Sequence, residues 1–324
     1  MEKSEKLKQE MLFSDDCEAF RSSLRKEIDD NIGVLQGLKA AFIIEHKFSR
    51  QQFKKIGHYY LEHTDGVMVL DWIPGIYHKN RAEFENNLTK ELFHKAEIIE
   101  IFQDKMKRAT ERKVYYPLYY IEPFAENAFA LGFDLGSTEI RRNALSNAAK
   151  TGEATATEPV QLIQSKKSEK GFLVFLPVFE NELYISKANK VLGFFAGVFT
   201  FNDLIKFSLN KTKFKQETNI IITINKEKIF DSEKSLNTTF LLKKSYLQVG
   251  NRVWQLEFKA AVLSQEYQRY IALVIPISGI LFTLFIAIFT FRVLTDNREE
   301  LNAAYQAITE KNTDLQRSNS DLEQ

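Results

Sequence analysis

Residues 271–291, IALVIPISGILFTLFIAIFTF, decide how the rest of the chain is organised, because none of these twenty-one residues carries a charge. An α-helix of this length extends about 31 Å, the thickness of the hydrocarbon layer of a bilayer. The alternative is a buried helix of a soluble core, but such a helix seldom runs over about twenty residues without a polar face. Pro276 and Gly279 are tolerated in spanning helices. The stretch therefore predicts a transmembrane helix over residues 270–291.

The flanks of this helix indicate which part of the chain faces the cytoplasm. Arg292 and Arg298 follow it, whereas Lys259 and Arg269 precede it, so the positive-inside preference favours a cytoplasmic C-terminus only weakly. On this topology residues 1–269 lie outside the cytoplasm, in the periplasm if the membrane is a bacterial inner membrane. The first sixty residues contain no apolar run long enough for a signal peptide or a first span. We therefore expect a membrane anchor upstream of this chain.

After the predicted span, an aliphatic residue recurs at every seventh position. These positions are Leu294, Leu301, Ile308, Leu315 and Leu322. If they are d positions of a heptad, the a positions are Arg298, Tyr305, Asn312 and Asn319. Polar a residues weaken a coiled coil, but Asn at a favours a parallel two-stranded register. We predict a cytoplasmic signalling coiled coil over residues 292–324, parallel and dimeric; a solvated single helix is the alternative.

The N-terminal segment shows a helical pattern over residues 11–45, because its apolar side chains recur at spacings of three and four. These side chains are Phe13, Cys17, Phe20, Leu24, Ile28, Ile32, Leu35, Leu38 and Phe42. Such a helix extends about 50 Å, which is longer than one small domain needs. We predict a stalk over residues 1–48 that pairs with its copy in a homodimer. The alternative is that its second half covers a sheet.

Helices and strands are mixed between this stalk and the membrane, which predicts an α+β fold. Ser49 and Gln52 form a capping box at the start of one helix, and Ser137 or Thr138 caps another that ends at Gly152. Further helices are predicted over residues 80–101 and 201–209. Strands are predicted over residues 67–77, 115–121, 128–133, 171–179, 182–186 and 191–199, with a smaller sheet over residues 219–261.

Composition and motifs exclude several classes of function. Lys and Arg (44) nearly balance Asp and Glu (43), a net charge of +1, which disfavours a nucleic-acid binder. Cys17 is the only cysteine, so there is no disulfide within the chain and no cysteine-built metal site. The five histidines show no HExxH or similar spacing, and neither a phosphate-binding glycine loop nor a GxSxG motif occurs. We predict no catalytic site, no metal and no cofactor, so this chain is not expected to be an enzyme.

Short motifs run through the centre of the chain in a fixed order. They are Trp72-Ile73-Pro74 with Arg81 and Phe84; Tyr116-Pro117; Tyr120-Ile121-Glu122-Pro123 with Asn127; Leu131-Gly132-Phe133-Asp134-Leu135; Arg141-Arg142 with Leu145; Gly171-Phe172; Pro177-Val178-Phe179; Leu192-Gly193; and Gly197-Val198-Phe199. Their order and spacing resemble those of the CHASE domain, the extracytoplasmic sensing module of membrane-bound histidine kinases and nucleotide cyclases. The resemblance covers about residues 67–205.

The resemblance implies two PAS-like subdomains after the stalk, here residues 49–209 and 210–269. The first, which lies farther from the membrane, is expected to bind a small ligand. A spanning helix on each side of the domain is also implied. Residues 315–324 resemble the helix that enters the phosphoacceptor domain of a histidine kinase, so we expect the sensor of a two-component system. Alternatives are the sensor of a diguanylate or adenylate cyclase, or a structural dimerisation ectodomain with a protein partner and no small ligand.

The resemblance also places a ligand site. Plant cytokinin receptors, the best-known members, bind through an aspartate that falls on Arg141 and a threonine that falls on Phe175. Arginine has only hydrogen-bond donors, so an adenine-type ligand is not expected in the same pose. A carboxylate or phosphate would suit Arg141 near a helix N-terminus; an ion pair with Glu139 or Glu158 is the alternative. The other residues expected around the cavity are Thr157, Leu162, Phe133 and Phe194, with core packing as the alternative for the aromatic ones.

Overall fold

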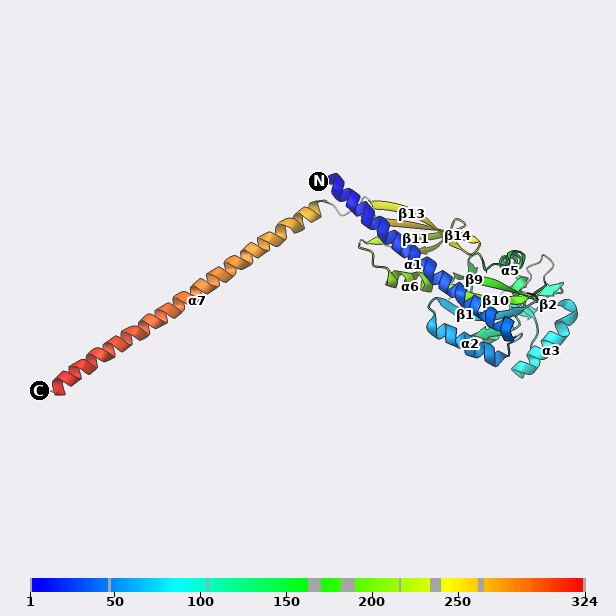
Figure 1. Ribbon diagram of the computed structural model, residues 1–324, viewed down its shortest axis with the longest axis horizontal. Coiled ribbons are helices and arrows are strands. Elements are labelled where there is room, and N and C mark those ends of the chain that lie inside the picture. The colour runs from blue at the N-terminus through cyan, green and yellow to red at the C-terminus, as the bar shows by residue number, and fades with distance from the viewer. Residues whose placement is uncertain are drawn as a thin grey trace. The chain divides into compact units, whose positions relative to one another are not determined.

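The computed structural model describes residues 2–45, 48–103, 105–162, 170–181, 190–215, 217–233, 240–261 and 265–322. The chain forms two compact units, Met1–Val262 and Leu263–Gln324. The first unit has α+β architecture, with a long N-terminal helix and two antiparallel sheets (Figure 1). The α+β expectation is therefore confirmed.

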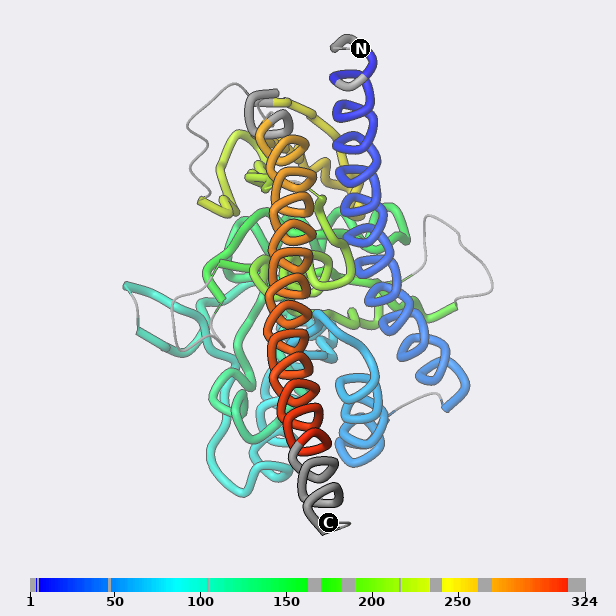
Figure 2. The backbone as a smooth tube through the Cα atoms, turned by 90° about the vertical axis from the view of Figure 1, so that its left-hand side faces the viewer, coloured from blue at the N-terminus to red at the C-terminus, as the bar shows by residue number. Residues whose placement is uncertain are grey.

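Helix α1 (Glu2–Glu45) runs along the first unit and contacts both sheets (Figure 1 and Figure 2). Of its nine apolar positions that predicted the helix, eight are buried and Ile32 is partly buried. This stripe therefore packs into the core of its own unit, as in the alternative of a sheet-covering helix. Pairing of two stalks through the same stripe is excluded, because the stripe is already covered.

The larger sheet has the strand order β6-β1-β10-β9-β7, with β8 beside β9, and all its pairs are antiparallel. Its strands are β1 (Val67–Pro74), β6 (Tyr120–Glu122), β7 (Thr155–Ala156), β8 (Val160–Gln161), β9 (Lys170–Phe179) and β10 (Val191–Thr200). One face packs against α1 and α2 (Arg50–His63) through Trp72 and Phe195. The other face packs against α5 (Glu139–Thr151). Because both faces are covered, the central strands are apolar almost throughout.

The smaller sheet has the order β12-β11-β14-β13 and follows α6 (Phe201–Lys211). Its strands are β11 (Thr218–Ile224), β12 (Glu227–Asp231), β13 (Phe240–Val249) and β14 (Arg252–Ala261). Trp254 of β14 packs edge-on against Phe172 of the larger sheet, with ring centroids 5.1 Å apart. The inner face of this sheet thus joins one core with α1 and one face of the larger sheet.

The remaining elements form the rim of the larger sheet. They are β2 (Ile76–Tyr77), η1 (His78–Asn80), α3 (Arg81–Leu92), β3 (Ile99–Phe102), β4 (Lys105–Arg108), β5 (Val114–Tyr115), α4 (Phe124–Asn127), η2 (Ala128–Ala130) and η3 (Leu135–Ser137). The expected capping box of Ser49 and Gln52 is confirmed. The helix predicted over residues 80–101 is too long, because Phe93 adopts a left-handed conformation that ends α3. Residues 128–133 are not a strand, since they begin with a 3₁₀ turn. The strand predicted over residues 182–186 lies outside the described residues.

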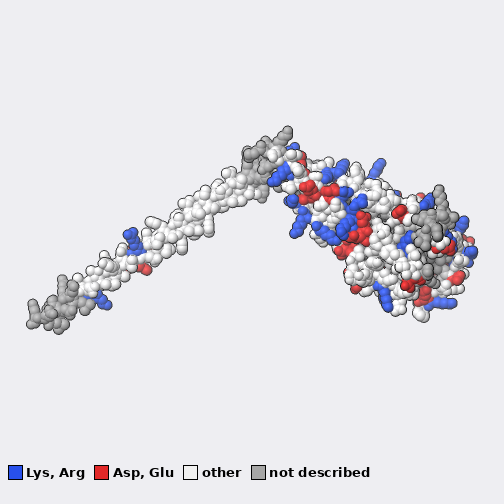
Figure 3. Space-filling view, viewed as in Figure 1, with Lys and Arg blue, Asp and Glu red and all other residues white. Residues whose placement is uncertain are grey.

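The second unit is one helix, α7 (Gln265–Leu322). Among the described residues it is the one helix that is long and apolar enough to cross a membrane, over Tyr270–Thr313. On the face seen in Figure 3, acidic and basic side chains are interspersed over the first unit, whereas α7 shows a long stretch with neither. The predicted span over residues 270–291 falls within this stretch.

Candidate ligand-binding site

Helix α5 places the candidate site against the larger sheet. Its buried residues are Arg141, Ala144, Leu145 and Ala148, which recur at helical spacing and turn one face to the sheet. The helix ends at Gly152, whose φ of 77° gives the left-handed cap that glycine favours. Thr138 is the N-cap residue, but its side chain makes no capping hydrogen bond. The first-turn amides of α5 are therefore not capped by the expected hydroxyl.

Arg141 is buried in the first turn of α5, with 7% of its surface exposed. Its guanidinium donates to the Thr138 hydroxyl and to the Gln161 carbonyl oxygen, both at 3.3 Å, and its Nε has no partner. The guanidinium carbon lies 5.7 Å from the centroid of the Phe133 ring. Burial lowers the pKa of Arg141 to about 10. The buried guanidinium is therefore held by two long hydrogen bonds to neutral oxygen atoms and has little contact with solvent.

The expected alternative, an ion pair with Glu139 or Glu158, is not formed. Glu158 instead accepts from Arg252 Nη1 at 3.1 Å. Across the described part of the chain, no carboxylate lies within 4.0 Å of the Arg141 guanidinium. The Ser137 hydroxyl, just before α5, is likewise buried without a partner. A buried charge without a counter-charge is costly, so this end of α5 suits a bound anion.

Four of the other predicted site residues lie in one apolar cluster beneath α5. They are Phe133, Leu162, Phe175 and Phe194. The rings of Phe175 and Phe194 meet edge-on with centroids 6.3 Å apart. Thr157 is also buried, but its hydroxyl accepts from the Leu173 amide at 3.1 Å and so fastens the segment after β7 to β9. The structure therefore groups the predicted residues on one sheet face, with Arg141 as their charged member.

Sequence reasoning missed a second ionisable group on the same sheet face. Asp71 of β1 is fully buried, and neither of its carboxyl oxygens has a hydrogen-bond partner. Burial raises the pKa of Asp71 well above its ordinary value of 3.8. The available signal was a single acidic residue within the otherwise apolar strand VMVLDWIP.

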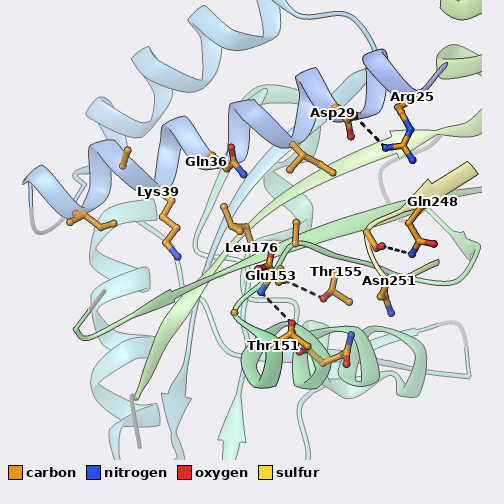
Figure 4. A pocket seen from close by; sticks show the side chains of 17 residues that line it. Arg25, Asp29, Gln36, Lys39, Thr151, Glu153, Thr155, Leu176, Gln248 and Asn251 are labelled. Carbon is orange, nitrogen blue, oxygen red and sulfur yellow. Dashed lines mark hydrogen bonds and ion pairs between the residues drawn. The ribbon is translucent and has the colours of Figure 1, made fainter. Parts of the chain in front are cut away.

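A hollow of about 720 Å³ lies away from these residues. It is bounded by α1, the C-terminal end of α5 and the turn at residues 248–251 (Figure 4). A smaller hollow of about 510 Å³ lies beside Arg50 and Tyr120. Neither is lined by a predicted site residue. We place the ligand site by its buried charges rather than at the 720 Å³ hollow, because no described residue that lines that hollow has a buried polar atom without a partner.

No group of three His, Cys, Asp or Glu side chains within the described ranges could hold a metal ion. The site thus offers a guanidinium, a hydroxyl and helix amides above aromatic rings. Such a set can bind and orient a small anion. It contains no nucleophile paired with a base among the residues that line it.

The first unit thus combines an α+β fold with a buried, unpaired guanidinium, and the second contains a helix long and apolar enough to cross a membrane. Residues 46–240, more than half of the chain, match the family model described as "CHASE domain". The chain therefore belongs to the CHASE domain family.

Among solved structures, the chain is similar to the "Extracellular ligand binding receptor from Desulfohalobium retbaense DSM5692". The two share 8% sequence identity and align with a TM-score of 0.49, over 77% of this chain and 40% of that one. The chain thus spans well under half the length of that receptor. No curated protein matches the chain.

Proposed function

We propose that this chain is the ligand-sensing and membrane-crossing part of a sensor histidine kinase, and that its ligand is a small anion held at Arg141. Residues 1–269 lie outside the cytoplasm, and residues 292–324 pass the signal to a C-terminal output domain. The observation that carries the proposal is the buried Arg141 guanidinium without a carboxylate partner. The heptad repeat after the span and the kinase-like residues 315–324 support a kinase output.

A guanidinium offers a planar pair of N–H groups that matches a carboxylate or a phosphate. In the free protein the Nε of Arg141 and the Ser137 hydroxyl are both unsatisfied, so an anion would supply hydrogen bonds that the protein lacks. The uncapped amides of α5 would add donors and a favourable helix dipole. All these groups favour the same charge, which makes the site selective for anions over neutral analogues.

Contacts lead from this site to the smaller sheet. The Gln161 carbonyl, which accepts from Arg141, belongs to β8, and Glu158 just before β8 is paired with Arg252 of β14. The Asn251 side chain, in the turn before β14, accepts from the Ala156 amide of β7 at 3.1 Å. Strand β14 is the last element before α7. A ligand that binds one arrangement of these contacts better than the other would shift the signalling equilibrium.

The experiment is a ligand screen on the purified chain in lipid nanodiscs. Unfolding is followed by tryptophan fluorescence, because the only two tryptophans, Trp72 and Trp254, are buried one in each sheet. The panel contains carboxylates, amino acids and phosphate monoesters, each with a neutral analogue. An anion at 100 times its Kd should stabilise the protein by about 2.7 kcal/mol, a shift of a few degrees.

Arg141→Met should abolish this shift, while Arg142→Met, on the exposed side of the same helix, should retain it. Equal shifts in the two variants would overturn the assignment of Arg141. If no anion of the panel stabilises the wild-type protein, a small anionic ligand is rejected and a protein partner becomes the better explanation.

A further inference from the structure

Asp71 lies at the centre of the larger sheet. Strand β1 is flanked by β10 and β6, and Asp71 is in register with Ala196 on one side and Ile121 on the other. Side chains alternate along a strand, so Asp71 shares a face with Val69 and Ile73. These two residues belong to the apolar cluster beneath α5. Asp71 therefore points toward the same apolar cluster that contains most of the predicted ligand residues.

This carboxyl group has no partner. Asp71 is 0% exposed, and both of its oxygens lack a hydrogen bond. The ionisable groups around this face are Arg141 of α5, Tyr116, and Asp134, which is paired with Arg112. None of them contributes to the raised pKa of Asp71, whose sole cause is burial. A buried carboxyl that nothing satisfies is costly and calls for a functional explanation.

The residue beside Asp71 on the neighbouring strand β10 has a small side chain. Asp71 is in register with Ala196 of β10, and Ala196 is in register with Phe175 of β9, one of the predicted ligand residues. The small Ala196 side chain separates the carboxyl from the aromatic ring. Strand β9, against which α5 packs, is two strand spacings or about 10 Å from β1.

Arg141 and Asp71 therefore both border the apolar cluster beneath α5, and they form no ion pair with each other. The pKa of Arg141, like that of Asp71, is shifted by burial alone, so neither charge compensates the other. A molecule with an anionic group at one end and a cationic group at the other would satisfy both. A simple anion would leave Asp71 unsatisfied, and a simple amine would leave Arg141 unsatisfied.

We propose that Asp71 is a second ligand-binding residue and that the ligand is a small zwitterion of the amino-acid class. Its carboxylate binds Arg141, its ammonium group binds Asp71, and its apolar part lies against Phe175 and Phe194. This inference rests on the anion site at Arg141. It adds a residue that the resemblance did not indicate, and it excludes phosphate esters and simple carboxylates as the preferred ligands.

Binding of such a ligand is linked to a proton. Burial raises the pKa of Asp71 well above its ordinary value of 3.8, which favours the protonated carboxyl group in the free protein. When the ammonium group docks, the carboxyl loses its proton to solvent and the carboxylate pairs with the cation. Each protonated Asp71 carboxyl group therefore releases one proton when the ligand binds, and no electron transfer or covalent bond is involved.

The test is titration calorimetry on the full chain in nanodiscs, in two buffers with different ionisation enthalpies. The probes are the proteinogenic amino acids and the matching carboxylates that lack the amino group. We expect one amino acid to bind about tenfold or more tightly than its des-amino analogue, with release of about one proton. Asp71→Asn should remove both the preference and the proton release.

Two further variants keep the result interpretable. Glu122→Gln removes another buried carboxyl, on the opposite face of the same sheet against Gly57, and should leave both effects intact. Asp71→Leu replaces the carboxyl with an apolar group, and its fold is checked by the emission of the buried tryptophans.

The outcomes separate the two proposals. If des-amino carboxylates bind as tightly as amino acids and still require Arg141, the zwitterion inference is overturned and the anion site stands. If amino acids bind without proton release, or bind Asp71→Asn equally well, Asp71 is not a ligand-binding residue. If no anion binds at all, the site at Arg141 fails, and the zwitterion inference fails with it.

Discussion

At the scale of single residues, Arg141 should reduce the stability of the ligand-free protein. Its pKa falls from 12.5 to about 10 on burial, which corresponds to roughly 3 kcal/mol. A base whose pKa falls on folding destabilises the fold fully below the folded pKa, here below about pH 10, and less as the pH rises above it. The whole effect is therefore present at pH 7.

We accordingly expect Arg141→Met to raise the free energy of unfolding by about 1–3 kcal/mol at pH 7 without ligand. Urea unfolding followed by tryptophan fluorescence measures this change. Arg142→Met should instead lower the free energy of unfolding by about 0.5–1 kcal/mol, because its exposed guanidinium loses one hydrogen bond to the Gly136 carbonyl oxygen. A destabilised Arg141→Met protein would mean that the guanidinium contributes to the fold rather than to a ligand site.

The two buried ionisable residues differ in how far sequence could reveal them. Arg141 was found through its place in a family motif, and Phe133, Phe175, Thr157, Leu162 and Phe194 came with it. Asp71 was missed because a single acidic residue in an apolar strand does not by itself show whether its carboxyl group has a partner in the fold. The absence of a carboxylate partner for Arg141 could not be predicted either. Glu158 is much nearer to Arg141 than to Arg252 in the sequence, yet it pairs with Arg252.

At the scale of elements, the ends of helices and strands were predicted correctly where nearby residues determine them. They were predicted wrongly where pairing with a distant segment determines them. The capping box of Ser49 fixes the start of α2 from within four residues. The end of α3 is set instead by the pairing of β3 with β4 and by the left-handed Phe93, neither of which has a local signal. Long strands such as β9 and β10 were predicted because their apolar runs are bounded by polar segments.

The turn before β14 should couple the ligand site to the smaller sheet. Gly250 has a positive φ of 52°, and an added Cβ would lie 3.0 Å from the Ala154 carbonyl oxygen, so the turn fits closely against the segment before β7. Asn251→Ala removes the bond to the Ala156 amide and should cost about 1 kcal/mol of stability.

In a Trp72→Phe background, Trp254 reports on the smaller sheet alone. We expect ligand binding to change Trp254 emission in this background, and Asn251→Ala to remove at least half of that change while ligand affinity stays within about twofold. Lys244→Ala breaks an ion pair to Glu257 inside the smaller sheet and serves as the control. An undiminished signal in Asn251→Ala would show that coupling takes another route.

At the scale of the whole molecule, the predicted coiled coil requires a second copy of α7. Its heptad residues Leu294, Leu301 and Ile308 are 62%, 69% and 61% exposed in the single chain, so their apolar surface is uncovered. The predicted parallel coiled coil would bury them between two chains. The apolar stripe of α1 cannot contribute, because it is buried in its own core.

Leu301→Cys should therefore form a disulfide between two chains under a mild oxidant in membranes. Ala303→Cys, two positions along and on the far side of the helix, should cross-link at least several-fold less. The native Cys17 is buried and should not interfere. Equal yields at positions 301 and 303, measured on non-reducing gels, would contradict the coiled-coil register.

The buried apolar stripe of α1 also determines which residues a chimaeric receptor must take from this chain. The family match begins at residue 46, yet the core begins at Phe13 and extends to Ala260. A chimaeric receptor joined at the edges of the match would leave out α1, which covers both sheets, and β13 and β14 of the smaller sheet. A domain that is to be transferred into another receptor should therefore contain all of residues 2–261. Helix α1 and the smaller sheet must be kept together with the ligand site.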